Sequence, residues 1–173
     1  MKILIAGGAG YIGSHTLISL ASAGYDFVVF DNLSNSSKKS IKRVEKIIKK
    51  PIAFEKGDIR NKKDLNKLFK KYEIDSVIHF AGLKAVGESV EKPIEYYTNN
   101  LTTTLIVSKM MKKYHVNQIV FSSSATVYGD PEVVPITEDC KLGDTTNPYG
   151  TTKAMMERIL TDVQHACTEM SVT

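Results

Sequence analysis

Short apolar runs alternate with longer segments of helical period along the chain. Strands are predicted for the apolar, β-branched runs near 2–6, 26–31, 51–57, 76–80 and 118–123. Helices are predicted where apolar residues recur at helical spacing, near 11–23, 37–49, 61–72, 93–115 and 149–169. Such alternation indicates βαβ units and a parallel sheet that is buried on both faces. Because crossovers between parallel strands are right-handed, the five strands predict an α/β fold with a doubly wound sheet and helices on both faces.

The length of 173 residues and the hydrophobic content of 42% fit one domain with its own core, covering residues 1–173. The longest irregular stretch runs from Gly129 to Pro148, and loops of that length are often functional. Residues 170–173 stand where a further strand would begin after the last helix. The chain is therefore expected to end before its fold is complete.

The composition and the N-terminal sequence indicate the cellular compartment of the protein. No apolar run approaches the roughly 20 residues of a membrane-spanning helix, and the N-terminus begins a strand rather than a signal sequence. Cys140 and Cys167 lack metal-ligand spacing and predict free thiols in a reducing compartment. We expect a soluble, cytoplasmic protein with no membrane contact and no metal ion.

The net charge of +4 comes mainly from lysine pairs on predicted helix surfaces and helix ends. Such charges usually form a solvated face. They are not interleaved with aromatic residues and form no recognition-helix pattern, so nucleic-acid binding is not expected.

A glycine-rich turn, GGAGYIG, follows the first predicted strand and leads into an apolar helix. Glycine lets the backbone bend tightly and approach a pyrophosphate, whose charge then meets free N–H groups and the positive end of the helix dipole. Gly7 and Gly10 would serve the turn and Gly13 the packing of helix on strand, as in a Rossmann-like fold. Glycines also mark ordinary turns, so the spacing alone leaves both interpretations open.

Two acidic residues follow the second and third strands. Asp31 lies roughly 20 residues beyond Gly13, the spacing at which a carboxylate accepts hydrogen bonds from the adenosine ribose and repels a 2′-phosphate. This favours NAD over NADP, although Asp31 could equally begin the turn formed by residues 31–35. Asp58 could bind an adenine amino group or cap the helix that begins near Asn61.

A candidate reactive group lies at the start of the C-terminal helix. Tyr149 and Lys153 are four residues apart, so both project from one face. An ammonium beside a phenol favours the phenolate and lowers its pKa, which makes a usable general base. A hydroxyl of the serines at 122–124, at the carboxyl end of the fifth strand, could bind the substrate oxygen and Tyr149. A surface tyrosine–lysine pair and serines that satisfy local backbone are the structural alternatives.

Six stretches carry a resemblance to a known family: GGAGYIGSHT at 7–16, DNLSNS at 31–36, GDIR at 57–60, HFAGLKAVGESVEKP at 79–93, FSSSATVYGD at 121–130 and NPYGTTKAMMERIL at 147–160. With them the chain resembles, over essentially its whole length, the bacterial UDP-glucose 4-epimerases of the extended short-chain dehydrogenase/reductase family. Glycine turns are shared by many families, whereas the runs within 79–93 and 121–130 are specific to far fewer families.

The resemblance implies NAD as cofactor, a UDP-sugar as substrate, and a homodimer formed through the helices near 93–115 and 149–169. In the family, the tyrosine matching Tyr149 removes the proton of the sugar 4-hydroxyl while hydride passes from C4 to NAD and later returns to the other face. The serine matching Ser124 contacts the substrate and assists this proton transfer, and Lys153 holds the cofactor ribose and tunes the tyrosine. The NAD site is implied to consist of Gly7, Gly10, Tyr11, Ile12, Gly13, Asp31, Asn32, Leu33, Asn35, Ser36, Asp58, Ile59, Phe80, Ala81, Gly82, Lys84 (near the pyrophosphate), Asn99, Tyr149 and Lys153.

The large departure from the family is at the C-terminus: the family continues into a lobe that binds the uridine diphosphate, and the C-terminal substrate lobe is expected to be absent here. Binding energy from the remote nucleotide is what positions the reacting carbon. The 173 residues are therefore expected to bind NAD but to be catalytically impaired.

Two other functions stay open. One is an NAD-binding module without turnover, against which the retention of Ser124, Tyr149 and Lys153 argues. The other is a related activity on UDP-sugars, such as decarboxylation or epimerisation of an N-acetylated sugar, because substrate choice depends largely on the absent lobe. A 4,6-dehydratase is disfavoured, since Ala125 and Thr126 stand where that family carries an Asp–Glu pair.

Overall fold

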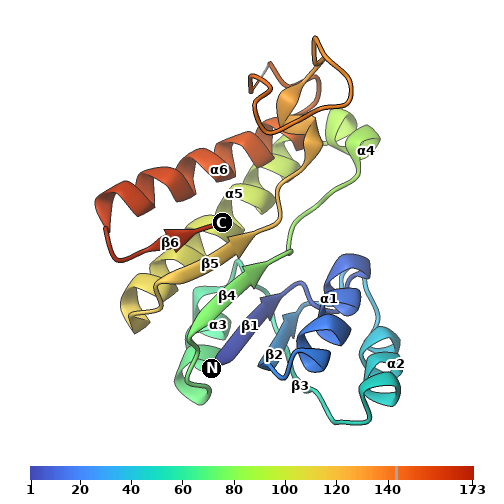
Figure 1. Ribbon diagram of the computed structural model, residues 1–173, viewed down its shortest axis with the longest axis vertical. Helices are drawn as coiled ribbons and strands as arrows, with labels where there is room; N and C mark the ends of the chain where they lie inside the picture. The colour runs from blue at the N-terminus through green and yellow to red at the C-terminus, as the bar shows by residue number, and fades with distance from the viewer. Residues whose placement is uncertain (143) are drawn as a thin grey trace.

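Six parallel strands form a single sheet in the computed structural model, which describes residues 1–142 and 144–173. Within that part of the chain the strands are β1 (Lys2–Ala6), β2 (Asp26–Asp31), β3 (Ala53–Lys56), β4 (Ser76–His79), β5 (Gln118–Phe121) and β6 (Ser171–Val172). Their order across the sheet is β3-β2-β1-β4-β5-β6, and all neighbours are parallel (Figure 1). The α/β, doubly wound, Rossmann-like fold expected from the sequence is confirmed.

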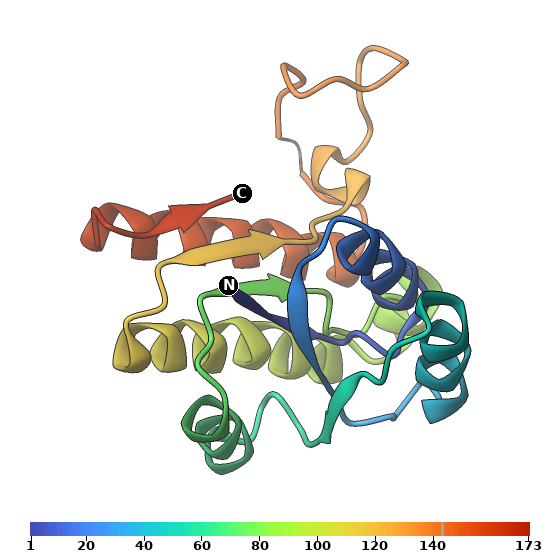
Figure 2. The same ribbon diagram turned by 60° about the horizontal axis from the view of Figure 1, so that its bottom comes forward.

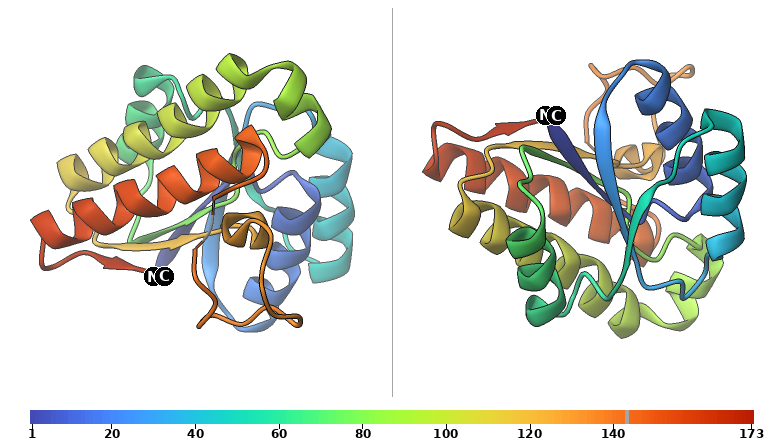
Figure 3. Two further views of the ribbon diagram at one scale, coloured as in Figure 1. Left: turned by 90° about the horizontal axis from the view of Figure 1, so that it is seen from above. Right: turned by 90° about the horizontal axis from the view of Figure 1, so that it is seen from below.

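Helices connect the strands and cover both faces of the sheet. They are α1 (Tyr11–Ser22), α2 (Lys38–Ile48), α3 (Lys62–Lys71), α4 (Val86–Glu91), α5 (Pro93–Tyr114) and α6 (Pro148–Ala166), with a short 3₁₀ helix η1 (Ala125–Tyr128). Side chains of α3, α5 and α6 join one buried apolar cluster, and those of α1 and α2 join another on the opposite face (Figure 3). In β1, for example, Leu4 belongs to the first cluster and Ile5 to the second, because successive side chains of a strand point to opposite faces.

The sixth strand stands where the sequence placed the start of a further strand, whereas the end of α6 differs from the prediction. The helix expected over 149–169 ends at Ala166, and the chain turns back so that Met170 is buried in the core. The Ser171 amide donates to the Asn117 carbonyl at 2.7 Å, and the Thr173 amide donates to the Ile119 carbonyl at 3.0 Å. These bonds form the strand whose start was expected at residues 170–173, and they place it beside β5 at the edge of the sheet.

The two short helices, α4 and η1, were not predicted. Each spans fewer than two turns, so neither can display a repeating apolar face. The irregular stretch expected from Gly129 to Pro148 is found, and in its described part it projects from the body of the molecule (Figure 2). Among the described residues, no helix combines the length and apolar character that a bilayer crossing requires.

The strand order reverses direction at β1, since the chain moves to β2 on one side of it and later to β4 on the other. The segments that leave β1 and β4 therefore separate, and a crevice opens at the carboxyl edge of the sheet. All candidate site residues from the sequence analysis lie at this edge or on the helices beside it.

Candidate functional site

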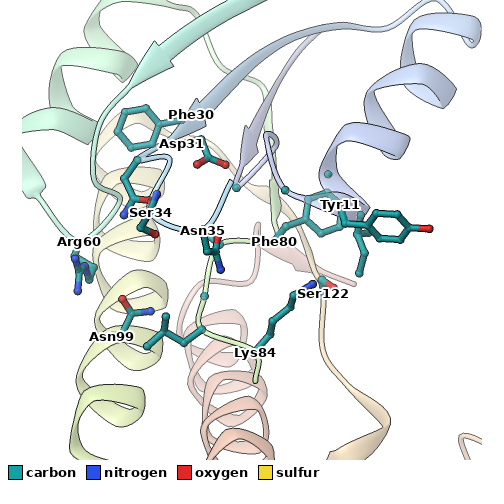
Figure 4. Close-up of a pocket in the computed structure, with 18 of the residues that line it drawn as sticks. Tyr11, Phe30, Asp31, Ser34, Asn35, Arg60, Phe80, Lys84, Asn99 and Ser122 are labelled. Carbon is teal, nitrogen blue, oxygen red and sulfur yellow. The ribbon is translucent and has the colours of Figure 1, made fainter. Parts of the chain in front are cut away.

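A cavity lies at the carboxyl edge of the sheet and receives residues that follow five of the six strands (Figure 4). It is bordered by the glycine turn after β1, the segment after β2, the residues after β3, the β4–α4 segment, the serines after β5 and the first turn of α6. Its lining residues are Gly7, Gly10, Tyr11, Ile12, Gly13, Phe30, Asp31, Asn32, Ser34, Asn35, Asp58, Arg60, Phe80, Ala81, Gly82, Leu83, Lys84, Asn99, Ser122, Ser123, Tyr149 and Lys153. Most of the residues expected to bind NAD are thus brought to one place.

The glycine turn is packed so closely that Gly7 and Gly13 leave no room for a side chain. Gly7 has a φ of +80°, and a Cβ built on it would lie 2.7 Å from the backbone nitrogen of Ala81. A Cβ on Gly13 would lie 2.7 Å from the Gly7 carbonyl oxygen. Among the described residues, no side chain caps the N-terminus of α1, which begins after Gly10. The first N–H groups of the helix are thus left for an anion, and this cradle fits the pyrophosphate of a dinucleotide.

Asp31 ends β2 and holds the surrounding backbone in place. One carboxylate oxygen accepts a hydrogen bond from the Ala9 amide at 3.0 Å, and the other accepts from the Leu33 amide at 2.8 Å and the Ser36 hydroxyl at 2.9 Å. The turn role considered for Asp31 is therefore present. A carboxylate accepts about four hydrogen bonds, so one acceptor position stays free for a ribose hydroxyl. Leu33 and Ser36, both expected in the NAD site, support Asp31 rather than line the cavity.

Asp58 does not cap α3. The cap is Asn61, whose side chain accepts from the Lys63 amide at 2.9 Å. Asp58 instead lines the cavity and is paired with Arg60, whose hydrogen bonds hold the pKa of the Asp58 carboxyl below its usual range. Ile59, which the resemblance also placed in the NAD site, has its side chain buried in the core.

The β4–α4 segment is fixed by the buried side chain of Asn100. Its amide oxygen accepts from the Leu83 amide at 2.8 Å, and its amide nitrogen donates to the Leu83 carbonyl at 3.0 Å and to the Thr152 hydroxyl at 2.9 Å. Asn100 thus joins the loop, α5 and α6 on the wall of the cavity. Lys84 extends from this wall into the cavity, as Figure 4 shows, where a cation is a suitable counter-charge for a pyrophosphate.

Lys153 is almost fully buried beside the serines after β5. Its ammonium donates to the Ser122 carbonyl at 2.7 Å and lies 4.7 Å from the centre of the Phe121 ring. Burial lowers the pKa of Lys153 to about 8. Burial and the charge of Lys153 also lower the pKa of His79, the last residue of β4, to about 3, so this imidazole is neutral near pH 7.

Tyr149 lines the cavity together with Lys153, at the start of α6. The helix is begun by Asn147, whose side chain accepts from the Gly150 amide at 2.9 Å. Among the described residues, no hydrogen bond joins Tyr149 to Lys153 or to Ser124. Ser124 lies outside the cavity lining, and its hydroxyl accepts from the Thr126 amide and hydroxyl at the start of η1. The serine hydroxyl that is buried and without a partner among the described residues is that of Ser123.

The pKa of Lys153 predicts an unusual dependence of stability on pH. Below pH 8 the folded protein buries a charged ammonium, whereas between pH 8 and the ordinary value of 10.5 only the unfolded chain keeps the proton. Folding therefore becomes more favourable as pH rises through this window, by about 3 kcal/mol in total. The test is urea unfolding of the cofactor-free protein and of Lys153→Met from pH 7 to pH 10.5. The free energy of unfolding of Lys153→Met, relative to that of the unaltered protein, should fall by about this amount over the range. A difference that stays constant with pH would contradict the assignment.

Comparison with known proteins places this geometry in a family. The model of the "NAD dependent epimerase/dehydratase family" matches residues 3–173. The chain belongs to this family. It is 60% identical to the UDP-glucose 4-epimerase of Pasteurella multocida and 58% identical to that of Haemophilus influenzae, over all 173 residues and 51% of each relative. A solved UDP-glucose 4-epimerase from Bifidobacterium longum, in complex with NAD+ and UDP, superposes with a TM-score of 0.97 at 52% identity, covering 99% of this chain and 51% of that one.

The chain of this epimerase/dehydratase family member spans about half the length of the curated relatives that it matches. Four residues line its cavity that the sequence analysis did not include in the site: Phe30, Ser34, Arg60 and Leu83. Ser122 and Ser123 belonged to the serine run considered for the substrate contact, although the resemblance pointed to Ser124. Arg60 stood two positions after Asp58. A local signal was therefore present, but nothing in the sequence shows which neighbour turns towards the cavity.

Proposed function

We propose that these residues form the NAD-binding half of a UDP-glucose 4-epimerase. The observation that carries the proposal is the convergence of Tyr149 and Lys153 with the glycine turn and Asp31 on one cavity. Family membership and the similarity to relatives named UDP-glucose 4-epimerase support it. That the enzyme works in the cytoplasm stays a prediction from the sequence.

The cofactor would lie across the carboxyl edge of the sheet. The glycine turn and the first N–H groups of α1 would bind its pyrophosphate, with Lys84 as a counter-charge. Asp31 would accept a hydrogen bond from the adenosine ribose and, because its carboxylate repels a 2′-phosphate, select NAD over NADP. When bound, NAD supplies a hydride acceptor at the sugar C4 and returns the hydride to the opposite face.

Tyr149 would act as the general base that takes the proton of the sugar 4-hydroxyl. Lys153 would bind the nicotinamide ribose through an ammonium that Ser122 and the Phe121 ring already hold in place. Ser124 is proposed to contact the substrate: its hydroxyl oxygen accepts from Thr126, and its own O–H would donate to a substrate oxygen.

We further propose that these 173 residues bind NAD but catalyse epimerisation slowly. The sugar is positioned by binding of the remote nucleotide of the substrate. NAD content and UDP-galactose 4-epimerase activity should be measured together on one preparation. Bound NAD with little or no turnover is the expected result. Bound NAD with full turnover would show that this half, or its oligomer, holds the substrate unaided, and the absence of NAD binding would contradict the proposed function.

A homodimer is proposed from the resemblance and from two exposed apolar side chains on α5 and α6. Leu105 is 43% exposed on α5 and Met155 is 43% exposed on α6, and the two helices pack side by side (Figure 1). Light scattering at micromolar concentration should give the mass of two chains, and Leu105→Lys should lower it to one. A single-chain mass for the unaltered protein would refute the dimer.

A further inference from the structure

We propose that Tyr96 is a positioning residue for Lys84: its buried hydroxyl fixes the backbone from which the Lys84 ammonium reaches the phosphates of the dinucleotide. The inference rests on the proposed function, since it takes the cavity to bind a dinucleotide with Lys84 as the counter-charge. Tyr96 does not line the cavity itself, and it was not among the residues implied by the sequence.

The Lys84 side chain reaches the cavity without a partner of its own charge type to steer it. Lys84 lies between β4 and α4, and its side chain extends into the cavity (Figure 4). In the part of the chain that the structure describes, no ion pair holds its ammonium. A lysine side chain is a flexible four-carbon stem. The direction of the ammonium therefore depends on how firmly the backbone around Lys84 is held.

Side chains of α5 hold the backbone on both sides of Lys84. Asn100 binds the amide and the carbonyl of Leu83, at 2.8 Å and 3.0 Å. Tyr96 lies one turn earlier on the same helix, and its hydroxyl accepts a hydrogen bond from the Ala85 amide at 3.0 Å. Ala85 is the first residue of the α4 cap, where no side chain of the described residues makes a capping bond. Tyr96 is thus the anchor on the α4 side of Lys84.

A second hydrogen bond orients the Tyr96 hydroxyl. It donates to Glu88 Oε2 of α4 at 2.9 Å. Tyr96 is fully buried, and burial together with the Glu88 bond raises its pKa to about 12, so the phenol keeps its proton. With that proton directed to Glu88, a lone pair of the oxygen is left for the Ala85 amide. One hydroxyl therefore joins α4 to α5 at the residue that follows Lys84.

The ordinary alternative is that Tyr96 only stabilises the packing of α4 on α5. Loss of its hydroxyl would then lower the free energy of unfolding, and any loss of NAD affinity would be the same with or without the Lys84 ammonium. A positioning role makes the two losses overlap, because a misdirected ammonium and a missing one remove the same contact. It also changes the salt dependence of NAD binding, since salt screens the attraction between an ammonium and a pyrophosphate.

The test is calorimetric titration of cofactor-stripped protein with NAD, at salt concentrations of about 0.05 M and about 0.5 M. Lys84→Met should weaken NAD binding about tenfold at the lower concentration, the size expected for a hydrogen bond to a charged group, and should reduce the salt dependence. Tyr96→Phe keeps the ring and loses only the hydroxyl. It should weaken binding about fivefold and also reduce the salt dependence, but in the Lys84→Met background it should change the affinity less than about twofold.

Tyr97→Phe removes a hydroxyl from the next residue of α5, outside the cavity lining, and is the matched control, with NAD affinity and salt dependence unchanged. Glu88→Gln keeps an acceptor for the Tyr96 hydroxyl and should lose less affinity than Glu88→Ala. If Tyr96→Phe did not fold, Glu88→Ala would test the same hydroxyl with and without Lys84→Met, because Glu88 is 43% exposed and its loss removes only the acceptor.

Three results separate the inference from the proposed function. Equal losses for Tyr96→Phe with and without the Lys84 ammonium, or an unchanged salt dependence, would overturn the inference while the proposed function stood. NAD binding by Lys84→Met as tight as that of the unaltered protein would do the same. If the unaltered protein bound no NAD, both would fail.

Discussion

Gly7→Ala is expected to abolish NAD binding and to lower the free energy of unfolding by about 3 kcal/mol or more. Two costs add together at this position. A φ of +80° is strained for a residue with a Cβ, at about 1–2 kcal/mol. The new Cβ would also stand 2.7 Å and 2.9 Å from the Ala81 nitrogen and Cα, which belong to the backbone and cannot rotate away. Relieving this clash would push the glycine turn away from the β4–α4 segment. Overpacking of this kind typically costs about 1–3 kcal/mol.

Two other glycines separate these causes. Gly24 has the same φ of +80° but no atom within 4 Å of a built Cβ, so Gly24→Ala should show the strain alone and leave NAD binding intact. Gly87 lies in α4, also without a close atom, and has no positive φ, so Gly87→Ala should be neutral or slightly stabilising. Urea unfolding and calorimetric titration of the three variants check this order. Equal destabilisation of Gly7→Ala and Gly24→Ala would show that the close approach to Ala81 is not essential.

The fold could be predicted because its signals are local. The apolar run of β2 and the helical period of α3 can each be recognised from a few neighbouring residues. The spacing of Gly7, Gly10 and Gly13 likewise identifies the turn. The start of β6 could also be expected after the last helix, but its partner could not, because its two residues are placed by amides and carbonyls of β5. Pairing between distant segments leaves little trace in so short a stretch.

The same limit applied within the site. Asp31 could be predicted because a strand end fixes its place, but its bonds to Ala9 and Ser36 depend on how the chain folds around it. The three serines after β5 look alike in the sequence, yet only the first two line the cavity, because Ser124 caps η1. Arg60 was missed since a charged residue near a helix start usually lies in solvent. Its pairing with Asp58 shows only in the structure.

Tyr149→Phe should reduce epimerase turnover by about 10²–10⁴-fold, the usual contribution of a positioned acid–base group. The affinity for NAD should change less than about twofold, because the ring still lines the cavity and only the hydroxyl is lost. Turnover is best measured in a protein that joins these 173 residues to the remaining half of the Pasteurella multocida relative, which is 60% identical over this region. NAD affinity is measured in the same protein by calorimetry.

Tyr97→Phe is the matched control, since Tyr97 lies on α5 outside the cavity lining and its loss should leave both quantities unchanged. The separation of the two readouts is what assigns the role. Loss of a cofactor contact would weaken NAD binding together with turnover, whereas loss of the base removes only the step in which the 4-hydroxyl gives up its proton. If Tyr149→Phe kept its turnover, another group would have to take that proton. Lys153 would then be the candidate, since it lines the cavity with Tyr149 and, with a pKa of about 8, would be partly neutral near pH 8.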